Sequence, residues 1–272
     1  MLYDVYGTPT EPKYNGFEHA INYTFQREPE YNIFYTVIRI PQKIPNGNKQ
    51  YPFVYYPNYP NGRAESAYEL NQRKNFLAVF NAGPFNTSNG LPSGTIIQNS
   101  QDLSVNEAPA GAWERILTID NNGVLGYAAL NTSASTLINN GVVSACTGFF
   151  PLIVDFKNVE DVDNTIAVNT SREEIAQRIA ICQYDDGDYA IIATESRGYR
   201  SGSGNTSETL SFKEFQQLIK KHGVKFAFAL DGGGSMEMVV GKRQLNPFYD
   251  NTYGRKVPTY IVFNGTTEFP AI

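Results

Sequence analysis

Short apolar runs recur along most of this chain, and they are separated by glycine, proline, asparagine and aspartate. Runs of this length with such boundaries predict β-strands joined by tight turns. The sequence at 185–188, Asp-Asp-Gly-Asp, predicts a hairpin, and the prolines and Asn-Gly pair within 41–47 predict another one between the first two strands. The predicted strands are residues 31–40, 51–56, 76–80, 95–98, 114–119, 124–129, 142–146, 152–156, 177–184, 189–194, 226–230, 236–240 and 257–263.

One segment instead shows the spacing of an amphipathic helix. Ser211 and Glu214 have the spacing of a capping box, and Gly223 supplies a helix stop. About a dozen strands against this one helix predict the α+β class, with a dominant sheet that is mostly antiparallel or mixed. The apolar positions at helical intervals are Phe212, Phe215, Leu218 and Ile219.

The helix leads into the run 226–230, which lacks polar alternation and is expected to be a strand buried on both faces. Residues 231–235, Asp-Gly-Gly-Gly-Ser, follow it directly. Three glycines at a strand end let the main chain approach a ligand, adopt positive φ and point several N–H groups at one anionic group. The alternative is a glycine-rich hairpin or bulge in which Asp231 is a solvated turn residue. The local sequence leaves both interpretations open.

Composition and charge narrow the classes of function. The formal net charge is −5 and no run of Lys and Arg is present, which argues against a nucleic-acid partner. No apolar stretch reaches the ~20 residues of a membrane span, and the first residues lack a signal-peptide pattern, so we expect cytoplasmic synthesis. Cys146 and Cys182 lie among apolar neighbours and are expected to be buried thiols. The two histidines exclude a histidine-rich metal centre.

Several motifs resemble, in their order along the chain, those of the phosphodiester glycosidase family. The element at 231–235 is the most specific, and Asn81-x-Gly83-x-Phe85 is moderately specific. The resemblance covers about residues 75–263. The other matching elements are Pro92-Ser93-Gly94 with Asn99, Arg178, Glu195-Ser196-Arg197, the helix start at 211–215, and Arg255-Lys256-Val257.

The resemblance implies a phosphodiester-glycosidase-like domain in residues 75–272, preceded by a β-rich accessory or attachment segment in residues 1–74. It also implies hydrolysis between the anomeric carbon of a sugar and a phosphate oxygen, as in the removal of N-acetylglucosamine from a phosphodiester on mannose. The leaving phosphomonoester has a second pKa near 6, so charge stabilisation should matter more than protonation of the leaving group.

The resemblance also assigns candidate roles. Asp231 first and Glu195 second are the expected carboxylates that activate water or attack the anomeric carbon, and Glu237 is a third candidate. Arg178 is the expected catalytic cation for the phosphate. The alternatives are a structural turn for Asp231 and a turn cap for Asn81. The expected substrate-binding set is Asn81 on a sugar hydroxyl, Gly83, the amides of Gly232, Gly233 and Gly234 as an anion nest, Ser235 and Arg255.

Pro84, Ile179, Ser196 and the pair Met236-Glu237 depart from the family pattern and put the substrate in question more than the fold. They leave open a catalytically inactive glycan-binding or structural phage protein of the tail or capsid. In the enzyme interpretation the partner is a phosphate-bearing glycan, such as a teichoic-acid-like envelope polymer met by a phage virion. Residues 1–74 would then serve virion assembly or homo-oligomerisation. No cofactor is expected, and the carboxylates leave Ca²⁺ open.

Overall fold

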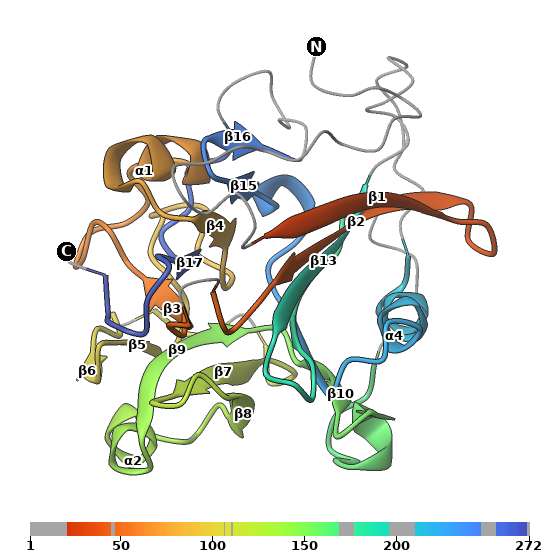
Figure 1. Cartoon of the computed structure of the whole chain (residues 1–272). Helices are drawn as coiled ribbons and strands as arrows, with labels where there is room; N and C mark the ends of the chain where they lie inside the picture. Colours follow the sequence, from red (N-terminus) through yellow and green to blue (C-terminus); the bar gives the residue numbers. More distant parts are fainter. Residues whose placement is uncertain are drawn as a thin grey trace.

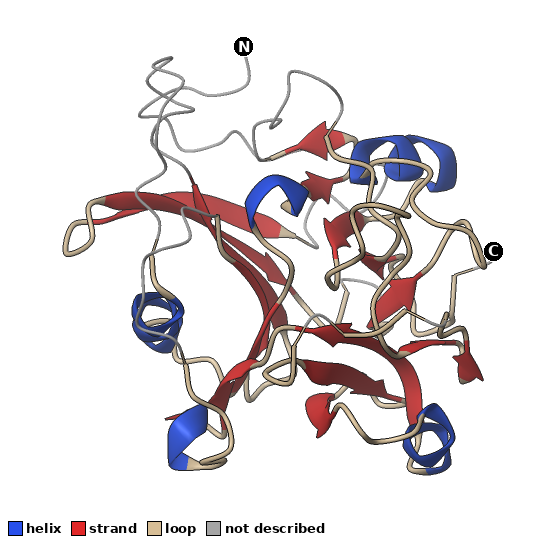
Figure 2. Cartoon of the chain, turned by 180° about the vertical axis from the view of Figure 1, so that it is seen from behind, coloured by secondary structure: helices blue, strands red, loops and turns tan. Residues whose placement is uncertain are grey.

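Three antiparallel sheets form the body of the molecule, and short helices lie at its periphery (Figures 1 and 2). The computed structural model describes residues 21–44, 47–105, 107–109, 111–168, 177–195, 210–245 and 254–270. All strand pairs within these ranges are antiparallel. The predicted α+β class with a dominant β component is therefore confirmed.

The strand order of each sheet interleaves distant parts of the chain. The seven-stranded sheet runs β1 (Asn22–Glu28), β2 (Ile33–Ile40), β13 (Tyr189–Glu195), β12 (Ile179–Gln183), β14 (Phe226–Ala229), β10 (Pro151–Val154) and β11 (Lys157–Asn158). The first five-stranded sheet runs β16 (Arg243–Gln244), β15 (Met238–Val240), β4 (Ala78–Asn81), β17 (Tyr260–Phe263) and β3 (Pro52–Tyr55). The second runs β6 (Gln101–Asp102), β5 (Ile96–Gln98), β9 (Val142–Gly148), β7 (Arg115–Asp120) and β8 (Leu125–Ala129).

The helices are short and lie outside the sheets (Figure 1). Two of them, α1 and α2, are additional to the predicted helix, which is α4. The helices are α1 (Ala67–Lys74), α2 (Ala134–Asn139) and α4 (Phe212–Lys220), with 3₁₀ turns η1 (Val159–Asp161) and η2 (Gly233–Ser235). No helix in the described ranges is long and apolar enough to cross a bilayer.

The predicted pair of α4 and β14 is confirmed. The side chain of Ser211 accepts from the backbone of Glu214, and the Glu214 side chain accepts from the backbone of Ser211, so both arms of the capping box form. Strand β14 is buried on both faces because its side chains alternate between two cores. Phe226 and Phe228 pack in the core shared by the three sheets, whereas Ala227 and Ala229 pack in the core that contains the apolar side chains of α4.

The predicted hairpin between residues 31–40 and 51–56 is wrong. Strand β2 pairs with β1 and β13, whereas β3 pairs with β17 in another sheet. The proline-containing loop therefore carries the chain between sheets, and the local partner of β2 is β1, which precedes it. Strands β1 to β3 of the predicted accessory segment 1–74 are hydrogen-bonded into sheets with strands of 75–272, and the attachment role of this segment stays a prediction.

The buried cysteines are confirmed as free thiols. Burial disfavours the thiolate and raises the pKa of Cys146 to about 12. Cys146 is therefore suited to packing and not to nucleophilic chemistry.

Candidate functional site

The triple-glycine bend lies where two of the sheets meet, at the end of β14. The backbone N–H of Asp231 donates to the carbonyl of Ala82 at 3.0 Å, directly after β4. The N–H of Gly233 donates to the carbonyl of Gln177 at 2.9 Å, two residues before β12 begins. Hydrogen bonds to two sheets fix the course of the bend, while Asp231 remains partly exposed.

Asn81 connects β4 to both ends of the bend. Its Nδ2 donates to the carbonyl of Asp231 at 2.6 Å, and its Oδ1 accepts from the backbone N–H of Glu237 at 2.9 Å. The side chain is buried, and each of its polar atoms bonds the main chain. These contacts favour a positioning role for Asn81, and contact with a sugar hydroxyl stays a prediction.

The glycines of the site serve either a close approach or a left-handed backbone conformation. A Cβ at Gly83 would lie 1.9 Å from the carbonyl oxygen of Thr147, and one at Gly232 would lie 2.2 Å from that of Gln177. Gly233 has a φ of 57°, in the left-handed region. A Cβ at Gly234 would lie 2.7 Å from a guanidinium nitrogen of Arg255. The absence of side chains therefore lets a cation lie directly against the bend.

The side chains of Asp231, Ser235 and Arg255 form one polar cluster on this bend. Ser235 and the N–H of Gly232 hydrogen-bond the Asp231 carboxylate, while Arg255 attracts it electrostatically. Nη1 of Arg255 donates to Oγ of Ser235 at 3.3 Å. Burial outweighs these stabilising contacts and raises the pKa of Asp231 to about 6.

Arg178 lies beside the bend through its main chain, because Gly232 is in contact with the backbone of residues 177 and 178. Its side chain is buried, with Nε donating to the carbonyl of Leu210 at 3.1 Å and the guanidinium carbon 4.0 Å from the ring centroid of Phe212. The position of Glu195 is known from its backbone, which ends β13 opposite Phe34. The side chain of Glu195 lies outside the described part of the structure, so its predicted role is not placed.

Glu237, the third candidate carboxylate, has a structural contact. Its Oε2 accepts from the backbone N–H of Ala67 at 2.7 Å, at the first residue of α1. A carboxylate at a helix N-terminus is stabilised by the helix dipole and by the unpaired N–H groups there. The side chain is buried, so Glu237 connects the bend to α1.

A group of aromatic rings next to Arg178 was not predicted from the sequence. Trp113 and Phe149 have ring centroids 5.0 Å apart, and Phe149 and Phe212 are 5.4 Å apart. Phe149 follows β9 and donates its N–H to the carbonyl of Ala229, two residues before Asp231. The available signals were that Trp113 is the sole tryptophan and that two phenylalanines follow a strand, and neither signal reveals that the rings meet.

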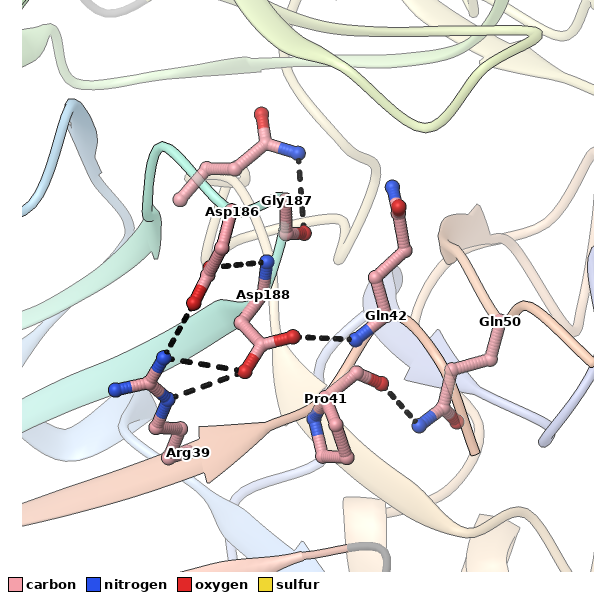
Figure 3. A network of polar contacts seen from close by, with 8 residues as sticks. Arg39, Pro41, Gln42, Gln50, Asp186, Gly187 and Asp188 are labelled. Atoms are coloured by element: carbon pink, nitrogen blue, oxygen red, sulfur yellow. Dashed lines mark hydrogen bonds and ion pairs between the residues drawn. The ribbon is translucent and has the colours of Figure 1, made fainter. Parts of the chain in front are cut away.

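A second polar cluster lies at the opposite end of β14, and Figure 3 shows part of it. Arg39 of β2 forms ion pairs with Asp186 at 2.9 Å and with Asp188 at 3.2 Å. Both aspartates belong to the β12–β13 hairpin that the sequence predicted. A cavity of about 570 Å³ lies beside this hairpin, lined in part by Tyr184 and Lys225. None of the residues predicted for the site lines this cavity.

Within the described ranges, no group of three or more His, Cys, Asp or Glu residues could hold a metal ion. The groups present at the bend are a carboxylate, a hydroxyl, a guanidinium and backbone N–H groups.

Comparisons with known proteins show the family and the fold. The sequence profile of the phosphodiester glycosidase family matches residues 74–264. The fold is similar to the catalytic domain of zebrafish N-acetylglucosamine-1-phosphodiester alpha-N-acetylglucosaminidase auto-inhibited by its pro-peptide, with a TM-score of 0.65 and 17% identity over 90% of this chain and 82% of that one. A hypothetical protein from Synechocystis has a TM-score of 0.61 and 16% identity over 90% of this chain and 62% of that one. A search of curated sequences returned no match. Because the family profile spans most of the chain, this protein belongs to the phosphodiester glycosidase family.

Proposed function

We propose that this protein hydrolyses sugar 1-phosphodiesters by breaking the bond between the anomeric carbon and the phosphate oxygen. The observation that carries the proposal is the cluster of Asp231, Ser235 and Arg255 on a partly exposed glycine bend. An acid and a cation held side by side match the two demands of the reaction, which are a nucleophile at carbon and charge stabilisation at phosphate.

The protonation state of Asp231 suits the first demand. With a pKa of about 6, the carboxyl group is largely ionised at neutral pH and remains basic enough to accept a proton. Its contacts with Ser235 and the N–H of Gly232 hold it in one orientation. Asp231 therefore acts either as the base that activates a water molecule or as the group that attacks the anomeric carbon.

Arg255 meets the second demand. A guanidinium offers donors in a fixed plane that match two oxygens of a phosphate. The contact between Gly234 and Arg255 holds this cation against the bend. The N–H of Gly232 already bonds the Asp231 carboxylate, and that of Gly233 bonds a main-chain carbonyl. The contribution of the glycine amides to phosphate binding would therefore come from the N–H of Gly234.

The reaction balances without a cofactor. The bond from the anomeric carbon to the bridging oxygen breaks, and its electron pair leaves with the phosphomonoester. Water supplies the hydroxyl group of the released sugar, and its proton passes through Asp231 to solvent. Because the phosphomonoester is a good leaving group, no strong general acid is needed. Glu195 remains the second candidate carboxylate and Arg178 the second candidate cation.

The proposal is tested by supplying N-acetylglucosamine 1-phosphodiesters and related sugar 1-phosphodiesters in ¹⁸O-labelled water. Phosphorus NMR should record a phosphodiester signal replaced by that of a phosphomonoester without ¹⁸O, since the carbon–oxygen bond breaks. Incorporation of ¹⁸O into the phosphate would indicate attack at phosphorus, and would contradict the proposal. The phosphate is the reliable reporter, because the anomeric oxygen of a free sugar exchanges with water.

A second candidate function is glycan binding without turnover. The contacts of Arg178 with Leu210 and Phe212 support it, because they are structural contacts of a residue expected to act in catalysis. Binding without product release, unchanged in Asp231→Asn, would favour this function.

We propose further that the natural substrate is a phosphate-bearing envelope polymer of the teichoic acid type, encountered in the setting of a phage virion. Such a polymer carries many phosphates and presents sugar faces along its length. Release of sugar from purified teichoic acids, at a higher rate than from a monomeric phosphodiester, would support the polymer. Co-sedimentation of the chain with phage particles would support the virion.

A further inference from the structure

A line of closely packed planar groups runs from solvent to the buried guanidinium of Arg178, whose backbone lies beside the proposed site. Trp113 stacks on Phe149 at 5.0 Å with an interplanar angle of 36°, and Phe149 stacks on Phe212 at 5.4 Å and 41°. The guanidinium of Arg178 then lies over Phe212. We call these four side chains the aromatic ladder. Its outer end, Trp113, is 47% exposed, whereas its inner end, Arg178, is buried.

The exposed ring is held in place and does not extend freely into solvent. A Cβ at Gly111 would lie 2.2 Å from Nε1 of Trp113, so the indole lies against the backbone of its own loop. The edge of Phe150 supports it from another side, with ring centroids 6.4 Å apart at 82°. A large apolar ring that is both fixed and half exposed presents a flat surface at little cost in side-chain entropy.

The ladder lies close to the bend. The N–H of Phe149 donates to the carbonyl of Ala229 at 3.1 Å, and Asp231 follows two residues later. A Cβ at Gly148 would lie 3.5 Å from the same carbonyl, while the carbonyl of Thr147 is in contact with Gly83. The end of β9 therefore joins the ladder to the strand ends that carry the site.

We infer that Trp113 is a sugar-binding platform that holds a pyranose ring of the substrate beside the proposed catalytic cluster. Sugar rings present a face of C–H groups that packs on an indole, while their hydroxyl groups remain in water. This inference rests on the proposed function, since Trp113 can hold the sugar for reaction only if the substrate reacts at the cluster around Asp231. Trp113 would therefore select among substrates by their sugar ring and would not contact the phosphate.

The chain offers a direct reporter, because Trp113 is its sole tryptophan. Tryptophan fluorescence of full-length Asp231→Asn, which removes turnover, would be recorded with a panel of glucose, galactose and N-acetylglucosamine 1-phosphates and with inorganic phosphate. A sugar 1-phosphate should shift the emission to shorter wavelength and protect it from acrylamide, and inorganic phosphate should do neither. Unchanged emission and quenching with every sugar 1-phosphate would overturn the inference.

Kinetics of single variants supply the second measurement. Trp113→Ala should raise KM by about threefold to tenfold with little change in kcat, and Trp113→Phe should restore most of the loss. The matched control is Phe156→Ala, because Phe156 is also 47% exposed. Its backbone N–H donates to the carbonyl of Lys225, which places it at the opposite end of β14 from the proposed site. Equal KM values for Trp113→Ala and Phe156→Ala would overturn the inference.

The two measurements separate this inference from the proposed function. Cleavage of phosphodiesters without a response of Trp113 would leave the function standing and remove the platform. A fluorescence response without cleavage of any phosphodiester would remove the function and keep Trp113 as a sugar-binding residue.

Discussion

The two ends of strand β14 carry aspartates in opposite surroundings. At the end that begins with Phe226, Lys225 pairs with the exposed Asp185 at 2.9 Å, and Arg39 pairs with Asp186. At the other end, Asp231 is partly buried on a glycine bend, and burial raises its pKa to about 6. The first end resembles an ordinary charged surface, in which ion pairs contribute little energy. The second has the perturbed protonation that marks functional sites.

The difference teaches that backbone geometry, and not the number of charges, distinguishes the candidate site. The hairpin at 185–188 has more acidic residues than the bend and two basic partners, Arg39 and Lys225. Its glycine, Gly187, only allows the tight turn. In the bend, the missing side chains of Gly232 and Gly234 let a neighbouring carbonyl and Arg255 approach closely. Close approach raises the electrostatic influence of each group on the other.

The largest expected effect that separates the two ends is on catalysis. Asp231→Asn should lower kcat for sugar 1-phosphodiester hydrolysis by about 10³-fold or more, since the amide neither attacks carbon nor accepts a proton. Asp186→Asn, the matched change at the other end, should leave kcat unchanged. Rates from product release, measured on both variants, check this. Comparable losses in the two variants would remove the distinction between the ends.

The next effect concerns stability. Gly232→Ala should lower the free energy of unfolding by about 3 kcal/mol, because its Cβ would meet the carbonyl of Gln177 and the backbone must shift. Gly232 has a φ of −106°, which alanine also adopts, so the cost is steric. Gly187→Ala should cost about 1 kcal/mol, since its φ of 91° is unfavourable but its neighbour is the movable side chain of Gln42. Denaturant unfolding of both variants measures the difference, and equal costs would refute it.

The third effect compares the cations. Arg255→Ala should lower kcat/KM by about 10-fold to 100-fold, because the phosphate loses a charged donor in a partly buried site. Arg255→Lys should recover only part of the activity, since a single ammonium lacks the planar pair of donors. Arg39→Ala, which removes the cation of the surface pairs, should change kcat/KM little. A full recovery by lysine would show that charge alone is required.

Local signals in the sequence were sufficient for α4, β14 and the bend. The capping box of Ser211 and Glu214, the uninterrupted apolar run and the glycine triplet are each contained within a few residues. Helix α1 has the same capping box, formed by Ser66 and Glu69. It was missed because its apolar positions are too few to give a helical pattern, and tertiary contacts such as that with Glu237 stabilise it.

Contacts between distant residues could not be read from the sequence. Strand β2 pairs with β13 across a large separation in sequence, and nothing near β2 specifies that partner. For the same reason the sequence suggested a sugar hydroxyl or a turn as the partner of Asn81, whereas the structure places its amide on the carbonyl of Asp231. The position of Trp113 beside Phe149 likewise required the fold.

The smallest expected effect is the dependence of stability on the protonation of Asp231. An aspartate in the unfolded chain titrates near 4, and burial raises the pKa of Asp231 in the folded chain to about 6. Between these values the folded protein holds a proton that the unfolded chain has lost. The stabilisation associated with this group is therefore fully present below about pH 4 and is lost as the pH rises through 6.

Asp231→Asn should consequently be more stable than the parent at pH 8 and close to it at pH 4, because the amide is never charged. Partial exposure of Asp231 screens its charge, so the gain at pH 8 should be about 1 kcal/mol. Urea unfolding at both pH values measures it, with Asp186→Asn as the control for removing an acid from a surface ion pair. A gain at pH 8 in the variant that has lost its catalytic activity would indicate that Asp231 is kept for chemistry at a cost in stability. A loss of stability at pH 8 would instead identify the carboxylate as a structural element of the bend.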